Sequence, residues 1–327
     1  MTDTTPASSH SHDITTLLDP LRAADAALAL RVKALEDKVT PPVDPPPVDP
    51  PPVTGKVVQF PGTGARTSAA FLALVADLSI DSIEWAPGTY PWASAVLVVA
   101  RPATRPLLVF TRGAVVWDGT GTANTPPWYV GNAAGAKAAY ITFDARAFGG
   151  SFTAANYRLG KVGLIFARNF DHIAFHGIKL VNVGGDLAVE PTGVLGPQHT
   201  HGVYLKTDPA WRSQWWASDD WEVIGPANRM LNGLQIDGSG GGVDHVHATG
   251  WKVENLHRWL YLWGIATDAI IDGWTGKNSD ATVDNYSATN AAGKVSNCHA
   301  TNCGPLAPGS GYWKAGTLGT DGGNTAT

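Results

Sequence analysis

Short apolar runs and single glycines recur along the chain at a nearly constant spacing. The stretch DHIAFHGIKLVNV at Asp171–Val183 returns as DHVHATGWKVENL at Asp244–Leu256. The residues that share the glycine slot follow one another in steps of 48, 25, 23 and 24, and they are Gly177, Gly225, Gly250, Gly273 and Asn297. Gly and Asn tolerate positive φ, so we expect a fixed corner at each of them. Strands too short to form a core alone, repeated at this length, predict a solenoid with coils of about 24 residues.

Apolar and polar residues alternate within each copy, which predicts strands with one buried face. In the first copy the inward positions are Ile173, Phe175, Ile178 and Leu180, and the outward ones are Ala174 and Lys179. In the second copy the inward positions are Val246, Ala248, Trp251 and Val253, and the outward ones are His247 and Lys252. Further apolar runs open each turn at GLIF, GVYL, GLQI and WLYL. The sequence therefore predicts a mainly β protein with three short strands in each coil.

The step between Gly177 and Gly225 is about twice as long as the others. Gly202 divides it into 25 and 23 residues, which allows two ordinary coils. One coil with two inserted loops is the favoured interpretation, because GPQHTH before Gly202 contains no strand-like run.

A helix is predicted over residues 14–40. Asp19 and Pro20 provide an N-cap and a proline at the first helical position. The spacing of four and three that marks a coiled-coil seam is kept by Leu21, Asp25, Leu28, Val32, Leu35 and Val39. The helix is too short to be stable alone, so it needs partners. Association between chains is favoured over packing against its own domain, because a stiff segment follows.

That segment, residues 41–53, reads PPVDPPPVDPPPV and predicts an extended polyproline II spacer of roughly 40 Å. The predicted organisation is a disordered or docking N-terminus (1–13), a helix (14–40), a spacer (41–55), the β domain (56–304) and a Gly/Thr-rich tail (305–327).

Composition excludes several classes of function. Charged residues make up 16% of the chain and the net charge is −5, so no basic field exists to attract nucleic acid. No run reaches the roughly 20 apolar residues of a membrane span, and the N-terminus lacks the pattern of a signal peptide. We therefore expect synthesis in the cytoplasm without membrane insertion. The only cysteines, Cys298 and Cys303, are either a reduced pair or a local disulfide.

Two further features resemble a known family. An amphipathic helix is predicted at Ser68–Leu78, with Thr67 or Ser68 as its cap, and IEWAPGTYPW (83–92) reads as a strand, a Pro-Gly turn and a strand. Together with the coil period, they resemble the pectate-lyase-like superfamily of right-handed parallel β-helices, and most of all its members in bacteriophage tail fibres, tailspikes and minor tail proteins. The resemblance implies a helix that caps the solenoid, a homo-oligomer (a trimer is favoured), attachment to other tail proteins through the N-terminus, and a place on the distal tail of the virion.

Many members of that superfamily cleave polysaccharides, so the resemblance makes the carboxylates candidate catalysts. Asp219 and Asp220 form the most suggestive pair, and His201-Gly202 is similar to the HG motif of polygalacturonase-like members. The other motifs of those enzymes are missing, and adjacent strand residues point to opposite faces. Turn and surface carboxylates are therefore the favoured interpretation, and catalysis by Asp219, Asp220 or His201 is left open.

Two residue types recur in shared slots. His172 and His245 occupy one slot and are expected to stack, and Asn182 and Asn255 occupy another, which predicts an asparagine ladder. A metal would need a third convergent ligand, so no metal and no cofactor are expected.

Tryptophan gives the stronger functional signal, since eight of the 13 fall between residues 211 and 274. Three of them lie in TDPAWRSQWWASDD, which reads as a surface loop. Flat indoles beside carboxylates suit the apolar face and hydroxyl rim of a sugar. The predicted glycan-binding or partner-binding residues are Trp211, Trp215, Trp216, Asp219 and Asp220. Contact with another protein and plain packing are the alternatives.

The leading hypothesis is a structural and adhesive component of a phage tail that contacts host surface glycan. A tail-borne polysaccharide depolymerase, either a hydrolase or a lyase, and a purely structural tail protein are the alternatives.

Overall fold

The computed structural model describes residues 55–64, 66–93, 95–121, 125–132, 135–159, 163–185, 200–208, 211–225, 231–285, 294–303, 313–314, 319–320 and 324–326. The predicted proline spacer, the N-terminal helix and its seam lie outside these residues; the seam residues are Leu21, Asp25, Leu28, Val32, Leu35 and Val39.

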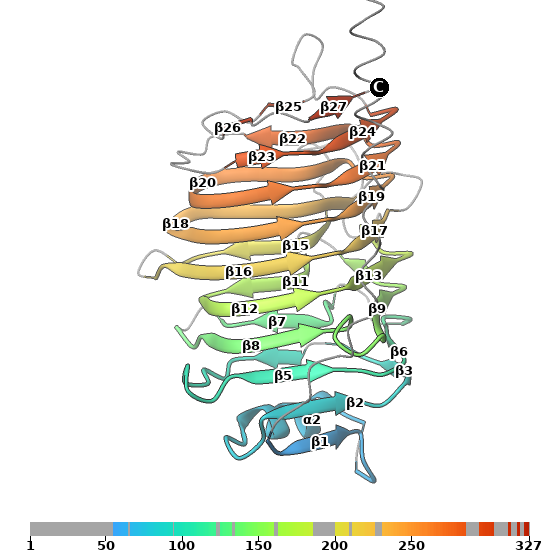
Figure 1. The fold of residues 1–327 in the computed structure, drawn as a ribbon, viewed down its shortest axis with the longest axis vertical. Coiled ribbons are helices and arrows are strands. Elements are labelled where there is room, and N and C mark those ends of the chain that lie inside the picture. Colours follow the sequence, from blue (N-terminus) through green and yellow to red (C-terminus); the bar gives the residue numbers. More distant parts are fainter. Residues whose placement is uncertain are drawn as a thin grey trace, which may run out of the picture. The chain divides into compact units, whose positions relative to one another are not determined.

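The described chain is mainly β, and its strands wind through three faces in a fixed order (Figure 1). The consecutive strands β2 (Ser82–Trp85), β3 (Gly88–Pro91) and β4 (Ala95–Leu97) do not pair with one another. Each pairs in parallel with the strand one turn later, so that β2 pairs with β5, β3 with β6 and β4 with β7. Such pairing stacks each turn of the chain on the previous one. These long parallel sheets are consistent with a β-helix or a similar solenoid, and they confirm the predicted mainly β class.

Each face collects one strand from every turn. Face 1 contains β1 (Val57–Phe60), β2, β5 (Leu107–Phe110), β8 (Ala138–Asp144), β12 (Phe170–His176), β16 (Ser213–Asp219), β23 (Lys294–Ser296) and β26 (Gly319–Thr320). Face 2 contains β3, β6 (Ala114–Asp118), β9 (Ser151–Ala155), β13 (Ile178–Val181), β17 (Glu222–Ile224), β19 (Lys252–Glu254), β21 (Thr275–Lys277), β24 (His299–Thr301) and β27 (Thr325–Ala326). Face 3 contains β4, β7 (Trp128–Val130), β11 (Gly163–Arg168), β15 (Thr200–Lys206), β22 (Ala281–Asn285) and β25 (Trp313–Lys314). The long strands β18 (Leu231–Thr249) and β20 (Arg258–Asp272) run from face 3 into face 1, and β10 (Arg158–Leu159) pairs with β14 (Gly184–Gly185).

Inward side chains from the three faces meet in one core, as the alternation predicts. The predicted inward residues of both copies are at most 3% exposed, whereas Lys179 and Lys252 are exposed. Tryptophans stack inside the core at the spacing of the coils. Trp251 lies 4.8 Å from Trp221 and 4.4 Å from Trp274, with interplanar angles of 3°. The indole N–H of each donates to a backbone carbonyl, which satisfies it without water.

The corner before face 2 has a positive φ in successive coils, and the predicted corners Gly177, Gly250, Gly273 and Asn297 all have it. Gly225 does not, so that prediction was wrong. The corner residue of its coil is Asp220, with φ 55°. The reason is that Gly225 follows the face 2 strand β17, whereas the other corner residues precede theirs. Lys179 pairs directly with Glu222, so β13 and β17 belong to adjacent turns. The long step from Gly177 to Gly225 is therefore one coil, which was the favoured interpretation.

The corner after face 2 carries the asparagine ladder. The positions with positive φ are Asn156, Asn182, Asn255, Asn278 and Asn302. The Asn182 amide donates to the Asn156 side chain, and the Asn302 amide donates to that of Asn278, both at 2.7 Å. Gly225 interrupts this ladder between Asn182 and Asn255, because a Cβ at Gly225 would lie 2.5 Å from the Asn255 carbonyl oxygen.

The helix α2 (Ser68–Ala76) lies at the β1 end of the stack (Figure 1). The side chain of Thr67 accepts the Ala70 N–H at 3.2 Å, and this confirms the predicted helix and its cap. Phe71 is fully buried and packs against Trp85 at 4.7 Å, so the helix covers the aromatic end of the core.

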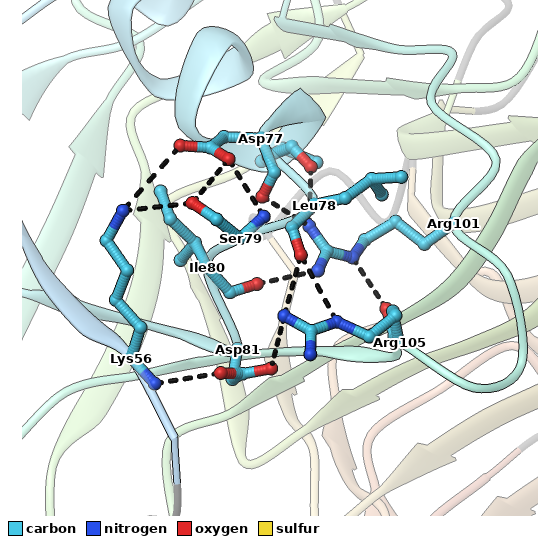
Figure 2. A network of polar contacts seen from close by, with 9 residues as sticks. Lys56, Asp77, Leu78, Ser79, Ile80, Asp81, Arg101 and Arg105 are labelled. Atoms are coloured by element: carbon cyan, nitrogen blue, oxygen red, sulfur yellow. Dashed lines mark hydrogen bonds and ion pairs between the residues drawn. The ribbon is translucent and has the colours of Figure 1, made fainter.

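A buried arginine closes the other end of α2 (Figure 2). Arg101 is 1% exposed, and its guanidinium donates to the carbonyl oxygens of Val75, Asp77, Ile80 and Arg105 at 2.6–3.1 Å. The C-terminal end of a helix carries a partial negative charge and unpaired carbonyls, which a cation with several donors satisfies. Arg101 thereby ties α2 to the first turns of the solenoid.

At the other end, the described strands β25, β26 and β27 pair with β22, β23 and β24 and extend the stack. The Gly/Thr-rich tail predicted at 305–327 thus contains three short strands of the stack. Cys298 and Cys303 are buried, and no disulfide joins them. Within the described residues, no helix is long and apolar enough to cross a membrane.

Candidate binding surface

The structure separates the three predicted binding tryptophans. Trp211 and Trp215 are 39% and 41% exposed, but Trp216 is 1% exposed and packs against Phe175 in the core at 5.6 Å. Trp216 was therefore wrongly predicted as a binding residue. The physical reason is that Ser213–Asp219 is the strand β16 and not a loop, so adjacent residues point to opposite sides of the sheet.

Trp215 belongs to a row of outward-facing rings on face 1, which we call the aromatic ladder: Tyr140, His172, Trp215 and His245. Tyr140 stacks on His172 at 4.6 Å, and His172 stacks on Trp215 at 5.3 Å. Trp215 stacks in turn on His245 at 4.1 Å. The four rings come from β8, β12, β16 and β18, so the ladder crosses four coils. The expected stacking of His172 with His245 therefore occurs through Trp215, which lies between them.

The ladder rests on an unusual backbone conformation that repeats from coil to coil. All four residues have φ between 50° and 59°, and Asp268 continues the series with 56°. The strand register skips the same position each time, since Asp171 pairs with Gln214 and Ile173 with Trp216. For a bulky residue such a conformation costs about 1–3 kcal/mol and persists only where the surroundings enforce it. The bulge turns each ring outward, away from the core.

Carboxylates fix the orientation of both histidines. His172 Nδ1 lies 2.6 Å from an oxygen of Asp171, and His245 Nδ1 lies 2.9 Å from an oxygen of Asp268. A carboxylate only accepts, so Nδ1 carries the proton, and Nε2 of a neutral ring is an acceptor. Imidazoles stack on both faces of Trp215, so its exposed part is the edge of the ring. The polar ring atoms left for a ligand are Nε2 of each histidine, which accepts while the ring is neutral, and the indole N–H of Trp215, which donates.

Charged groups line the same edge of face 1. Lys137 Nζ lies 3.7 Å from Asp171, and the Gln214 amide donates to the same carboxylate at 3.4 Å. Arg212 donates to Asp244 through Nη2 at 2.8 Å. These residues flank the ladder with fixed hydrogen-bonding groups.

Trp211 lies in the turn between β15 and β16, where the chain passes from face 3 to face 1. Its backbone N–H donates to the Asp208 carbonyl at 2.9 Å. Gly135 supports the indole: a Cβ there would lie 2.9 Å from Trp211 Cζ2 and 3.3 Å from its Nε1. One part of the ring thus rests on the backbone of the turn before β8, and Trp211 remains partly exposed to solvent.

The catalytic candidates do not form a site. Asp219 contacts His176 at 3.0 Å and accepts from Thr249 at 2.7 Å, and Asp220 is paired with Arg146. Burial acts to raise the pKa of Asp219, but the bonds from His176 and Thr249 outweigh it and hold the pKa below its ordinary value. Asp219 is therefore an anion at neutral pH and no general acid. Nor are Asp219 and Asp220 part of the ladder.

His201 lies on β15, on a different face from Asp219. It is 7% exposed, and its Nδ1 lies 3.2 Å from the Asn232 amide nitrogen. Burial, with a contribution from Arg258, lowers the pKa of His201 to about 3. A neutral, enclosed imidazole of this kind is a poor base, and the structure does not bring it to the aspartates. Among the described residues, no group of three or more His, Cys, Asp or Glu side chains is arranged to hold a metal.

Sequence reasoning noted the shared slot of His172 and His245 but missed Tyr140 and the place of Trp215 in it. The ladder position could have been recognised as the one directly before an inward apolar residue in each copy, as in Tyr140-Ile141 and Trp215-Trp216. The spacing between coils varies here, so a fixed period does not reveal it.

No protein-family model matches this chain, and neither does any curated protein. Among solved structures, the chain is similar to ORF18 of Geobacillus virus E2, a phage protein, with 12% sequence identity and a TM-score of 0.33. The match covers 83% of this chain, which spans only 60% of that protein. At this distance the likeness carries no functional argument.

Proposed function

We propose that this protein is a structural and adhesive component of a phage tail. Its right-handed parallel β-helix, with three strands per coil, would display the aromatic ladder and Trp211 to glycan on the host envelope. The N-terminal helix would join copies into a small oligomer, with a trimer favoured, and attach them to other tail proteins. The proline-rich spacer would project the solenoid from the distal tail of the virion.

The observation that carries the proposal is the aromatic ladder. Four bulky rings are held outward in strained backbone conformations, although each would gain free energy by burial. A purely structural solenoid has no need of this arrangement, because its rings stack inside the core. Strained residues that cluster on a surface indicate a binding role.

The exposed edge of the ladder matches the chemistry of a glycan. A sugar hydroxyl both donates and accepts, so a row of hydroxyls fits His172 Nε2, the Trp215 N–H and His245 Nε2. Trp215 therefore contributes a hydrogen bond and not a stacking face, contrary to the expectation from sequence. Trp211 is the indole with an open surface for the apolar side of a sugar ring. Several weak sites on one oligomer would add avidity.

The test is retention of host-envelope polysaccharide by the immobilised full-length chain. We expect Trp211→Ala and Trp215→Ala each to weaken retention, and Trp215→Phe to weaken it too, since the ring remains but the donor is lost. Thr142→Ala is the control on the same face, because Thr142 of β8 is partly exposed between the buried Ile141 and Phe143 and does not belong to the ladder. Retention that is unchanged in all the tryptophan variants would reject the proposal.

The same incubation separates adhesion from depolymerisation. Chromatography of the recovered polysaccharide should show its original length, whereas shortened products would support an enzyme. For the oligomer, light scattering should give a lower mass after deletion of residues 1–40, and an unchanged mass would remove the role of the helix.

A further inference from the structure

A hollow lies on face 3, whereas the aromatic ladder lies on face 1. It is a groove of about 310 Å³, and its lining residues are Val96, Tyr129, Gly131, Asn132, Phe166 and Arg168. The strand register aligns Val96 of β4 with Tyr129 of β7 and Phe166 of β11. Tyr129 and Phe166 meet edge to face at 5.9 Å, and Val96 is 39% exposed. Three successive coils thus build one apolar wall.

The turn after β7 forms the polar rim of this groove. Gly131 has φ 69°, its N–H donates to the Leu97 carbonyl at 2.7 Å, and a Cβ there would lie 1.7 Å from the Arg168 carbonyl oxygen. Only glycine allows this approach, which holds the turn against β11. The side chain of Asn132 then closes the turn by accepting the Ala136 N–H at 3.2 Å. The rim is therefore preformed.

The charge in the groove is already balanced. Arg168 is paired with Asp208, and Asp208 also accepts from the Asn169 amide at 3.0 Å. The Arg168 side chain is still 27% exposed, so its guanidinium can donate to a ligand. Burial raises the pKa of Tyr129, whose hydroxyl is therefore protonated at neutral pH. A paired cation gives no preference for an anion, so these groups favour a neutral ligand with hydroxyl groups.

We propose that this groove binds a single neutral sugar ring, with its apolar side against Phe166 and Val96 and its hydroxyls toward Arg168 and Asn132. The volume is at the small end of ligand pockets, which fits one ring and not an extended chain. This inference rests on the proposed function, since it names a subsite of the same adhesive surface. The turn that bears Asn132 also bears Gly135, the support of Trp211, so a glycan held in the groove can continue toward Trp211.

Saturation-transfer NMR on the full-length chain tests the subsite with glucose, galactose, mannose, rhamnose, glucuronic acid and galacturonic acid. We expect transfer to the C–H protons of at least one neutral sugar, with a dissociation constant in the millimolar range that is normal for one ring. Phe166→Ala should weaken that binding about fivefold, the loss expected for one aromatic contact. Tyr261→Ala is the matched control, because Tyr261 continues the same outward column three coils away and does not line the groove.

Equal transfer in the wild type and Phe166→Ala, or tighter binding of either uronic acid than of every neutral sugar, would overturn the inference. Polysaccharide retention by the wild type separates this inference from the proposed function. If the polysaccharide is retained and no neutral sugar receives saturation, the groove inference fails and the adhesive function stands. If a neutral sugar binds in the groove and the polysaccharide is not retained, the groove inference stands and the adhesive function fails.

Discussion

Replacing Arg101 by methionine should destabilise the end of the solenoid that α2 covers. Methionine keeps an unbranched chain as far as the position of Nε and removes every donor. Of the four carbonyl oxygens that Arg101 binds, those of Val75 and Ile80 are buried, whereas those of Asp77 and Arg105 are partly accessible to water. A buried acceptor without a partner costs about 1–3 kcal/mol, so two of them predict a loss of about 2–6 kcal/mol.

Removing a buried charge also returns its desolvation penalty, which is several kcal/mol. Arg101→Met should nevertheless lower the stability, because a hydrogen bond from a charged donor is worth about 1.5–3 kcal/mol and all four are lost together. The stability of Arg101→Lys should fall between those of the wild type and Arg101→Met, since an ammonium keeps the charge but lacks the planar fork that reaches separate carbonyls.

Urea unfolding followed by tryptophan fluorescence measures the effect, because Trp85 and Trp92 pack against Phe71 of α2 and report on this end. Hydrogen exchange of the α2 amides should lose protection in parallel. Arg105→Met is the control: Arg105 donates to Leu78 at 2.8 Å and contacts Asp81 at 3.2 Å, but its side chain is 44% exposed, so about 1 kcal/mol or less is expected. If the arginine at 105 matters as much as that at 101, or if Arg101→Met leaves the midpoint unchanged, the capping argument is refuted.

Two further outcomes follow from the corners and the carboxylates. Gly225→Ala places a Cβ 2.5 Å from the Asn255 carbonyl oxygen and should cost about 1–3 kcal/mol, whereas Gly64→Ala, with no atom within 4 Å, should be close to neutral; equal thermal midpoints for the two variants would contradict this. In acid, stability should fall, because the pKa of Asp118 is held below its ordinary value by bonds from Asn156 and Thr120, and that of Asp219 is lowered by His176 and Thr249 in spite of burial. The unfolded chain then binds more protons, so the stabilisation is complete above about pH 4 and is lost as the pH falls through the lower, folded-state pKa. Urea midpoints between pH 7 and pH 3 measure the loss, Asp219→Asn should reduce the slope, and midpoints that do not change with pH would disprove the assignment.

The sequence predicted the solenoid because its strongest constraints are local. A corner needs Gly or Asn at one position, and a strand with one buried side needs strict alternation, so Gly177 and the residues around Ile173 could be placed without knowing their neighbours. The same alternation explains the error at Trp216. Assigning Ser213–Asp219 to a loop removed the alternation that distinguishes Trp215 from Trp216, and a change of one residue in register exchanges the two sides of a strand.

Predicting the candidate surface requires knowing which residues lie next to each other in adjacent coils. A single repeat period does not give that alignment. The ladder positions are 32, 43, 30 and 23 residues apart from Tyr140 to Asp268, because loops of different length leave the coils. A loop adds little cost at the surface, so the spacing between equivalent positions is free to drift while the stacking is kept. Gly225 was misassigned for the same reason, since its distance from Gly250 fits the period although it lies at the other corner.

Stacking of aromatic rings does not by itself distinguish scaffold from binding surface in this protein. Trp221, Trp251 and Trp274 stack inside the core as closely as His172, Trp215 and His245 stack outside it. The difference lies in their polar atoms. Each inner indole donates to a carbonyl at 2.6–2.8 Å, so the stack is complete without a ligand. Among the described residues, the N–H of Trp215 has no such partner, and the nearby carboxylates take only the Nδ1 side of each histidine. Under the proposed function, such a row of rings with filled faces would be completed by a partner that supplies hydroxyl groups, and recognition would lie on face 1 and not in the core that supports it.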